Sequence, residues 1–359
     1  MEGGAIGSVG GPQRGQAPAA HPSPAPPPAA GPAGGRGPLG LILKAGVSVA
    51  LLALLFSRVD RAQMAAALRG ASLPLLLSCL PLYVVGQTLS TWRWQILLRA
   101  EGIRVPLRRL LALYLEGMFF SLCLPTAVGG DVVRGYRIWH LTQAGEGAVA
   151  SILVERVTGT VAMIGIAAAA TAAAFASGTL RDPLIGLFVA AVAVALAAAV
   201  VLLGSPWALG LADRLAGRRA GGRIFQAVRR FCEAVQRYRG HRAAVGAALG
   251  ISLAFQMLLI FLVFLVAVAL HLPVTFGQFL IFIPILNVLA MLPISLGGLG
   301  IREGGAVILL GKVGVDPAGA LTLSLLWFAV VAVTSLPGGI VFLWGGHRAK
   351  ARPAPAVAE

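Results

Sequence analysis

Charged residues are scarce in this sequence: Asp, Glu, Lys and Arg make up 12% of 359 residues, whereas hydrophobic residues make up 58%. Soluble domains carry about 25% charged residues, so this composition excludes an ordinary soluble protein. Cysteine is scarce as well. Cys79, Cys123 and Cys232 are isolated, which excludes a CxxC metal or redox motif, and we expect the first two to be small apolar core residues.

The sequence also lacks the motifs of common hydrolases. It contains no GxSxG, HExxH or DxxD pattern, and its five histidines show no metal-ligand spacing. Asp131 and Glu155 are the best acidic candidates for catalysis, and both suit the role of arginine partner equally well. We therefore expect neither an enzyme nor a bound cofactor or metal.

Acidic residues are few relative to basic ones, with 13 Asp and Glu against 29 Lys and Arg and a net charge of +16. Such a charge is common in nucleic-acid-binding proteins, but here the arginines lie between hydrophobic runs. That placement matches the positive-inside rule and contact with anionic lipid headgroups. We expect no nucleic-acid partner.

Long hydrophobic runs are what the sequence has in abundance. Several reach the roughly 20 residues that a helix needs to cross the bilayer. The expected fold is therefore all-α, a polytopic helical bundle integral to the membrane. The predicted spans are Leu39–Phe56, Pro74–Ser90, Ala148–Ala176, Pro183–Leu203, Ala243–Leu270 and Pro317–Gly346.

Composition divides the chain into a Pro/Gly/Ala-rich tail expected to be disordered (1–38), a transmembrane domain (39–346) and a basic tail (347–359). An arginine-rich loop, 204–242, interrupts the domain and should be cytoplasmic. Apolar residues at helical spacing in GRIFQAVRRFCEAVQRYRG predict an amphipathic helix within it. Trp92 and Trp94 lie beside arginines, which is typical of an interfacial belt.

One short pattern occurs twice, as LPTAVGGDVVRG and as LPISLGGLGIREG. Both copies break a hydrophobic run with proline, continue with a glycine pair and then present an arginine. Backbone N–H groups at a glycine pair can approach an anion closely, and arginine suits phosphate. The corresponding residues are Leu124, Pro125, Gly129, Gly130 and Arg134 in the first copy and Leu292, Pro293, Gly297, Gly298 and Arg302 in the second.

The breaks predict that segments 110–128 and 278–296 are re-entrant, although full crossings remain the alternative. With re-entrant segments, halves 39–176 and 183–346 each cross three times and form inverted repeats, a recurring transporter design. Most Lys and Arg residues then fall on the cytoplasmic side if the N-terminus is cytoplasmic. The C-terminus is expected on that side too.

GGDVVR at 129–134, VER at 154–156 and PISLGGLGIREG at 293–304 resemble the signature blocks of the lysylphosphatidylglycerol synthase transmembrane family, also called flippase-like proteins. The resemblance covers about residues 38–346 and implies lipid translocation. Little sequence follows Gly346, so we expect this chain to lack the synthase half. The resemblance implies these site residues: Gly129, Gly130, Asp131, Arg134, Glu155, Arg156, Gly297, Gly298, Arg302 and Glu303. The helical spacing of the charges adds Arg137.

These observations favour a translocator of an anionic or phosphate-bearing lipid, either a phospholipid or a polyprenyl-phosphate-linked headgroup. A membrane-embedded glycosyl or acyl transferase and a regulatory scaffold are the alternatives, and a homo-oligomer is left open. The Ala-, Gly- and Arg-rich composition is typical of a high-GC genome, which favours a bacterial plasma membrane.

Overall fold

The chain is helical throughout the residues that the structure, a computed structural model, describes, namely 38–123, 129–205, 210, 222–292, 295 and 298–349. The predicted tails lie almost wholly outside these residues, and their state stays a prediction. The helices are α1 (Pro38–Arg58), α2 (Arg61–Gly70), α3 (Leu73–Ala100), α4 (Leu107–Cys123), α5 (Gly129–Thr142), α6 (Gly145–Ala176), α7 (Pro183–Gly204), α9 (Gly222–Arg237), α10 (Arg242–Ala269), α11 (Phe276–Met291), α12 (Ile301–Gly311) and α13 (Pro317–Ala349), with a short 3-10 turn at Tyr238–Gly240.

Five of the described helices, α3, α6, α7, α10 and α13, are long and apolar enough to cross a membrane. The surface of α7 supports this, because Leu184, Leu187 and Val194 are each at least 67% exposed. Apolar side chains this exposed along a whole helix face require lipid rather than water. The protein is therefore a multi-pass integral membrane protein. The described apolar part of α1, Gly46–Ser57, is shorter than a full crossing, so its span stays a prediction.

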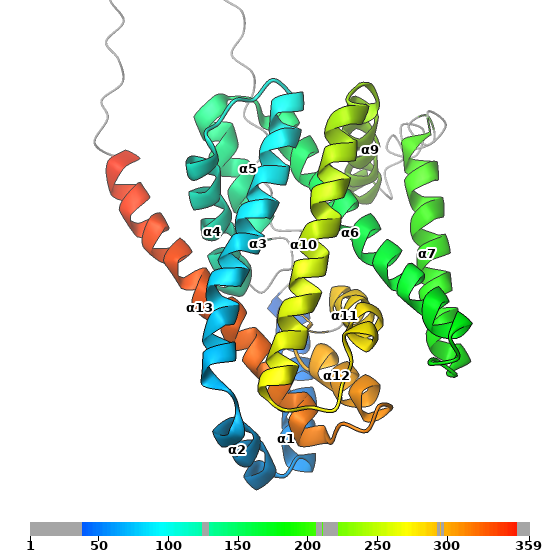
Figure 1. The fold of residues 1–359 in the computed structure, drawn as a ribbon. Coiled ribbons are helices and arrows are strands. Elements are labelled where there is room, and N and C mark those ends of the chain that lie inside the picture. Colours follow the sequence, from blue (N-terminus) through cyan, green and yellow to red (C-terminus); the bar gives the residue numbers. More distant parts are fainter. Residues whose placement is uncertain are drawn as a thin grey trace, which may run out of the picture.

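Helices of matching length follow one another in the two halves of the chain. The helices α3 and α10 both have 28 residues, α6 and α13 have 32 and 33, and α4 and α11 have 17 and 16. Figure 1 shows α3 and α10 side by side at the centre, with α6 and α13 sloping away to opposite sides. Neighbours are exchanged between the halves, since α4 packs on α13 whereas α11 packs on α6.

Helices end and restart at both copies of the repeated pattern. The helix α4 ends at Cys123 and α5 begins at Gly129, while α11 ends at Met291 and α12 begins at Ile301. Each pair packs together, α4 with α5 and α11 with α12. The predicted interruption of the hydrophobic runs is confirmed at both places. By contrast, α3 continues through Pro81 without ending there.

Side-chain caps fix several helix starts. Asp182 precedes Pro183 and accepts a hydrogen bond from the Leu184 amide at 2.9 Å, which satisfies a free N–H of α7. Its other oxygen accepts from Lys312 Nζ at 2.5 Å, joining the start of α7 to the end of α12. This hydrogen bond from Lys312 is the main reason that the pKa of Asp182 lies below its usual value.

Glycine permits the tight crossing of α13 over α4. A methyl group added at Gly338 would overlap the carbonyl oxygen of Leu115, and one at Gly339 would lie 2.9 Å from the Phe119 ring. The two backbones therefore touch with no side chain between them. Side chains fill the packing between α10 and α11 instead, where Ile260, Leu262 and Phe279 are almost fully buried.

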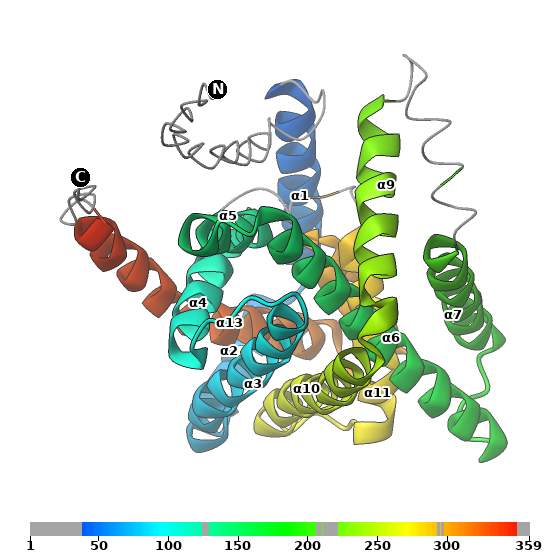
Figure 2. The ribbon, with the colours of Figure 1, turned by 90° about the horizontal axis from the view of Figure 1, so that it is seen from above.

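Two local expectations need correction, and one is confirmed. Trp94 is fully buried and so does not belong to an interfacial belt, whereas Trp92 is 46% exposed and its place in such a belt stays a prediction. Cys123 is exposed at the end of α4 rather than in the core. The amphipathic segment of loop 204–242 does form a helix, α9, which runs across the direction of α10 (Figure 2).

Candidate functional site

A buried carboxylate, Glu155, is the centre of the first charged cluster. It lies on α6 with 3% of its side chain exposed and binds two arginines, one on each oxygen. Arg93 Nη2 of α3 lies 2.8 Å from Oε1, and Arg134 Nη2 of α5 lies 2.5 Å from Oε2. The hydroxyl groups of Ser90 and Tyr114 also donate to Oε1, both at 3.3 Å. One carboxylate thus joins three helices and, through Tyr114, α4 as well.

Arg134 is enclosed by aromatic rings as well as by acids. Its guanidinium carbon lies 4.1 Å from the ring centroids of both Trp94 and Tyr114. Cation–π contacts of a desolvated guanidinium contribute up to about 2 kcal/mol each. Asp131 accepts from Nη1 at 3.4 Å, and Nε is buried with no partner among the residues that the structure describes. Arg134 is therefore closed to any ligand until α3, α4 and α5 separate.

Arg93 extends the cluster to the neighbouring central helix. Its Nη1 donates to Ser252 on α10 at 2.9 Å, and its guanidinium carbon lies 5.5 Å from the Phe255 ring. The Nε of Arg93, like that of Arg134, is buried with no partner in the described part of the chain. Two buried arginines with spare donors indicate a site that is short of acceptors.

Further ion pairs extend this cluster beyond Glu155. Glu116, almost fully buried on α4, accepts from Arg137 Nη2 at 2.5 Å, and Asp131 accepts from Arg156 as well as from Arg134. These ion pairs join four arginines to three carboxylates, and one of the four, Arg156, is 48% exposed at the edge of the cluster. These groups are Arg93, Arg134, Arg137, Arg156, Glu116, Asp131 and Glu155.

The second cluster surrounds Glu303 at the start of α12. Its Oε1 accepts from Arg302 Nη2 at 2.6 Å and from the Ser324 hydroxyl at 3.2 Å. Its Oε2 accepts from the Gly300 amide at 2.7 Å, which caps the helix. Glu303 is 1% exposed and fully occupied by these donors. Its geometry makes it the residue that orients Arg302.

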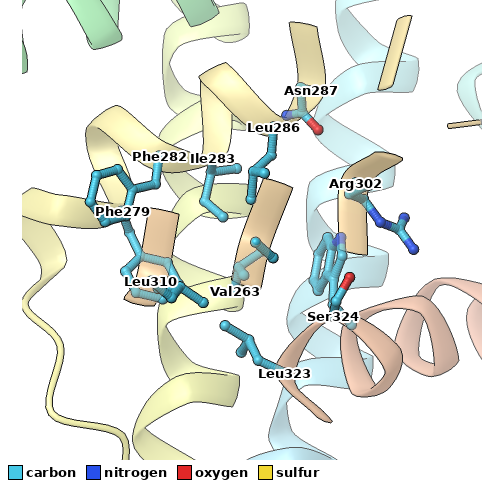
Figure 3. Close-up of a pocket in the computed structure, with 12 residues that line it drawn as sticks. Val263, Phe279, Phe282, Ile283, Leu286, Asn287, Arg302, Leu310, Leu323 and Ser324 are labelled. Atoms are coloured by element: carbon cyan, nitrogen blue, oxygen red, sulfur yellow. The ribbon is translucent and has the colours of Figure 1, made fainter. Parts of the chain in front are cut away.

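Arg302 is the more open of the two repeated arginines, with 22% of its side chain exposed. Its Nε and Nη2 bind Glu303, and its Nη1 has no partner among the described residues. Figure 3 shows Arg302 beside Asn287 and Ser324 at one side of a narrow pocket, with Phe279, Phe282 and other apolar side chains at the other. The pocket has a volume of about 40 Å³, which is close to that of one water molecule and too small for a lipid headgroup.

The helix α6 connects the two clusters. Glu155 belongs to the first, and Met163, eight residues further along, accepts a weak hydrogen bond from Asn287 at 3.6 Å. Eight residues of helix correspond to about 12 Å. Asn287 also lines the pocket beside Arg302, so this pocket reaches α6 about two helical turns from Glu155.

The glycines of the repeated pattern have packing roles. A methyl group at Gly130 would overlap the carbonyl oxygen of Gly117, so α5 crosses α4 backbone to backbone. Gly298 has a positive φ of 80° and lies against Ala290, which excludes a side chain at that position. Gly129 is buried in the first turn of α5, and Gly297 lies outside the described residues. Anion binding by these glycines stays a prediction.

The structure brings Asp131, Arg134, Glu155 and Arg156 together, places Arg137 beside them through Glu116, and keeps Arg302 and Glu303 in a separate group. Sequence reasoning missed Arg93, Trp94, Tyr114 and Ser324. A signal for the α3 residues did exist, because Gln87, Ser90, Thr91 and Trp94 recur at helical spacing and are all buried.

Comparison with protein families gives one match, to the family described as lysylphosphatidylglycerol synthase TM region, over residues 41–338. The match includes both charged clusters and both copies of the repeated pattern. No curated protein matches the chain.

Proposed function

The chain belongs to the lysylphosphatidylglycerol synthase TM region family, and on this premise we propose that it translocates an anionic or phosphate-bearing lipid across the bacterial inner membrane. The substrate class is a phospholipid or a polyprenyl-phosphate-linked lipid, and no covalent step is involved. Two buried arginines, Arg93 and Arg134, bind the one carboxylate of Glu155, and this shortage of acceptors in the described part of the chain carries the proposal. A charge kept away from water requires a counter-charge, and a phosphate headgroup supplies it.

Arg302 is the side chain that we assign to headgroup binding. Its free Nη1 points away from Glu303, and its planar guanidinium can donate two parallel hydrogen bonds to a phosphate once it turns. Arg134 plays a different part in this proposal. It is held by two rings and two carboxylates, so it closes the path in the present conformation.

We further propose that the two halves are inverted repeats and that α4–α5 and α11–α12 are re-entrant hairpins. The similar lengths of the paired helices and their exchanged neighbours support this arrangement. Figure 1 draws α4 and α5 in the upper part of the molecule and α11 and α12 in the lower part, which fits one hairpin for each membrane face. A pocket of about 40 Å³ at Arg302 then belongs to a closed state, and passage requires rocking of one half against the other.

Reconstitution in liposomes tests the function. Liposomes would carry tail-labelled fluorescent phosphatidylglycerol in both leaflets, and dithionite, which does not cross the bilayer, would bleach the outer one. With a translocator, the inner-leaflet label also becomes bleachable, whereas protein-free liposomes retain it. Labelled phosphatidylcholine, which has no net charge, is expected to move more slowly. Bleaching equal to that of protein-free liposomes for phosphatidylglycerol and polyprenyl phosphate alike would contradict the proposal.

Topology provides a separate prediction. We expect single cysteines placed in the loop 204–242, near the N-terminus and in the C-terminal tail all to be protected from a membrane-impermeant maleimide in whole cells. The arginine content of these segments should hold them in the cytoplasm. A cysteine at exposed Ser177, between α6 and α7, should be labelled. Labelling of the loop from outside would rule out the inverted-repeat arrangement.

A further inference from the structure

A wide groove of about 800 Å³ is bounded by α6, α7, α9 and α10. Half of its lining residues are valine, with Val154 and Val157 from α6, Val200 from α7, Val235 from α9 and Val245 from α10. The helix α7 packs on α6 and α9, so the groove occupies the wedge between α7 and α10. An apolar volume of this size between membrane helices has to be filled by a hydrocarbon group.

Two arginines, Arg239 and Arg242, line the same groove at the turn between α9 and α10. Both are exposed, and neither has an ion-pair partner among the described residues. Nearby Arg237 differs, because it binds both Glu101 and Glu146. No acidic residue lines the groove in the part of the chain that the structure describes. Its polar mouth is therefore purely cationic.

The other polar groups of the groove are already satisfied. Tyr238 is buried and donates to the carbonyl oxygen of Leu97 at 2.8 Å, and Thr158 donates to carbonyl oxygens of its own helix. Burial raises the pKa of the Tyr238 phenol, which keeps it neutral. An occupant of the groove therefore meets two free guanidinium groups and an otherwise apolar wall.

We propose that this groove holds one anionic phospholipid, with its phosphate between Arg239 and Arg242 and an acyl chain along the valine wall. The combination of unpaired cations at one end and hydrocarbon along the length matches a phospholipid and neither a soluble anion nor an uncharged lipid. The bound lipid fills the wedge and ties α7 to α10. This site is separate from the Glu155 and Arg302 clusters, and its occupancy does not depend on translocation.

Native mass spectrometry of the full chain in detergent, titrated with phosphatidylglycerol, tests the site. The double variant Arg239→Gln/Arg242→Gln should bind the first phosphatidylglycerol about thirty-fold more weakly, because each arginine contributes to attraction of the headgroup. The matched control Arg229→Gln/Arg230→Gln removes the same charge from exposed positions of α9 outside the groove. It should change affinity by about threefold or less.

A third variant tests whether the acyl chain of the lipid lies in the groove. Gly246 lines the groove, and a Cβ atom added there would meet nothing within 4 Å, so we use Gly246→Leu to place a side chain in the space. It keeps every charge, yet it should also weaken phosphatidylglycerol binding, while glycerol phosphate should bind poorly to all variants. Equal losses of phosphatidylglycerol affinity in the two double variants would mean that general surface charge, and not this groove, attracts the lipid. Full affinity in Gly246→Leu would overturn the assignment of the acyl chain to the groove.

Discussion

Replacing Glu155 with alanine is expected to destabilise the protein by about 3–5 kcal/mol, the usual effect of breaking a buried ion pair. The substitution leaves Arg93 and Arg134, both at most 7% exposed, without their shared carboxylate. Asp131, at 3.4 Å from Arg134, compensates only in part. A lower unfolding temperature and a lower yield in detergent would report the loss.

Glu146→Ala provides the matched control for this experiment. Glu146 lies on the same helix, but its side chain is 86% exposed and pairs with Arg237 at the surface. The control should therefore lose no more than about 1 kcal/mol. Similar losses of stability in both variants would mean that the buried cluster contributes no more to stability than a surface ion pair does.

Replacing Arg302 with alanine should reduce lipid translocation to the rate of protein-free liposomes. Arg302→Lys should recover part of the rate, because lysine keeps the charge but cannot donate two parallel hydrogen bonds to one phosphate. Arg302→Ala also removes the cation from buried Glu303, so lower stability alone does not decide the role of this arginine.

A comparison of two further variants separates binding from folding. Glu303→Gln keeps groups able to bond Gly300 and Ser324, and Arg302→Ala/Glu303→Gln differs from it only in the arginine. If Arg302 binds the headgroup, translocation falls between the first variant and the second at equal yield and unfolding temperature. Equal rates in these two variants would assign Arg302 a structural role only.

The sequence predicts the elements of this fold well and the contacts poorly. Apolar runs identify the crossing helices, and proline with paired glycine locates the two interruptions. Ion-pair partners depend on how helices that are far apart in the sequence pack against each other, and no local sequence pattern contains this information. Glu155 therefore binds Arg93, 62 residues away, rather than adjacent Arg156, since neighbours on a helix point about 100° apart.

Two further side chains show the same limit. Tryptophan near arginine is typical of a membrane interface, yet Trp94 stacks on Arg134 inside the protein. A glycine pair favours an anion site, yet the absence of a side chain at Gly130 is already required by the backbone of α4. In both cases the residue type is compatible with two environments, and only the packing of another helix selects between them.

The contact between α13 and α4, made through glycine, differs from the contact between α11 and α6 in how far it can adjust. Where Gly338 rests on a carbonyl oxygen, no rotamer can adjust, so we expect the contact between α4 and α13 to stay fixed and to act as the pivot between the two halves. The opposite crossing, α11 on α6, meets through adaptable side chains such as Met163 and Asn287, which can repack as the surfaces slide. We therefore expect any movement of one half against the other to begin at the contact between α6 and α11 rather than at the contact between α4 and α13.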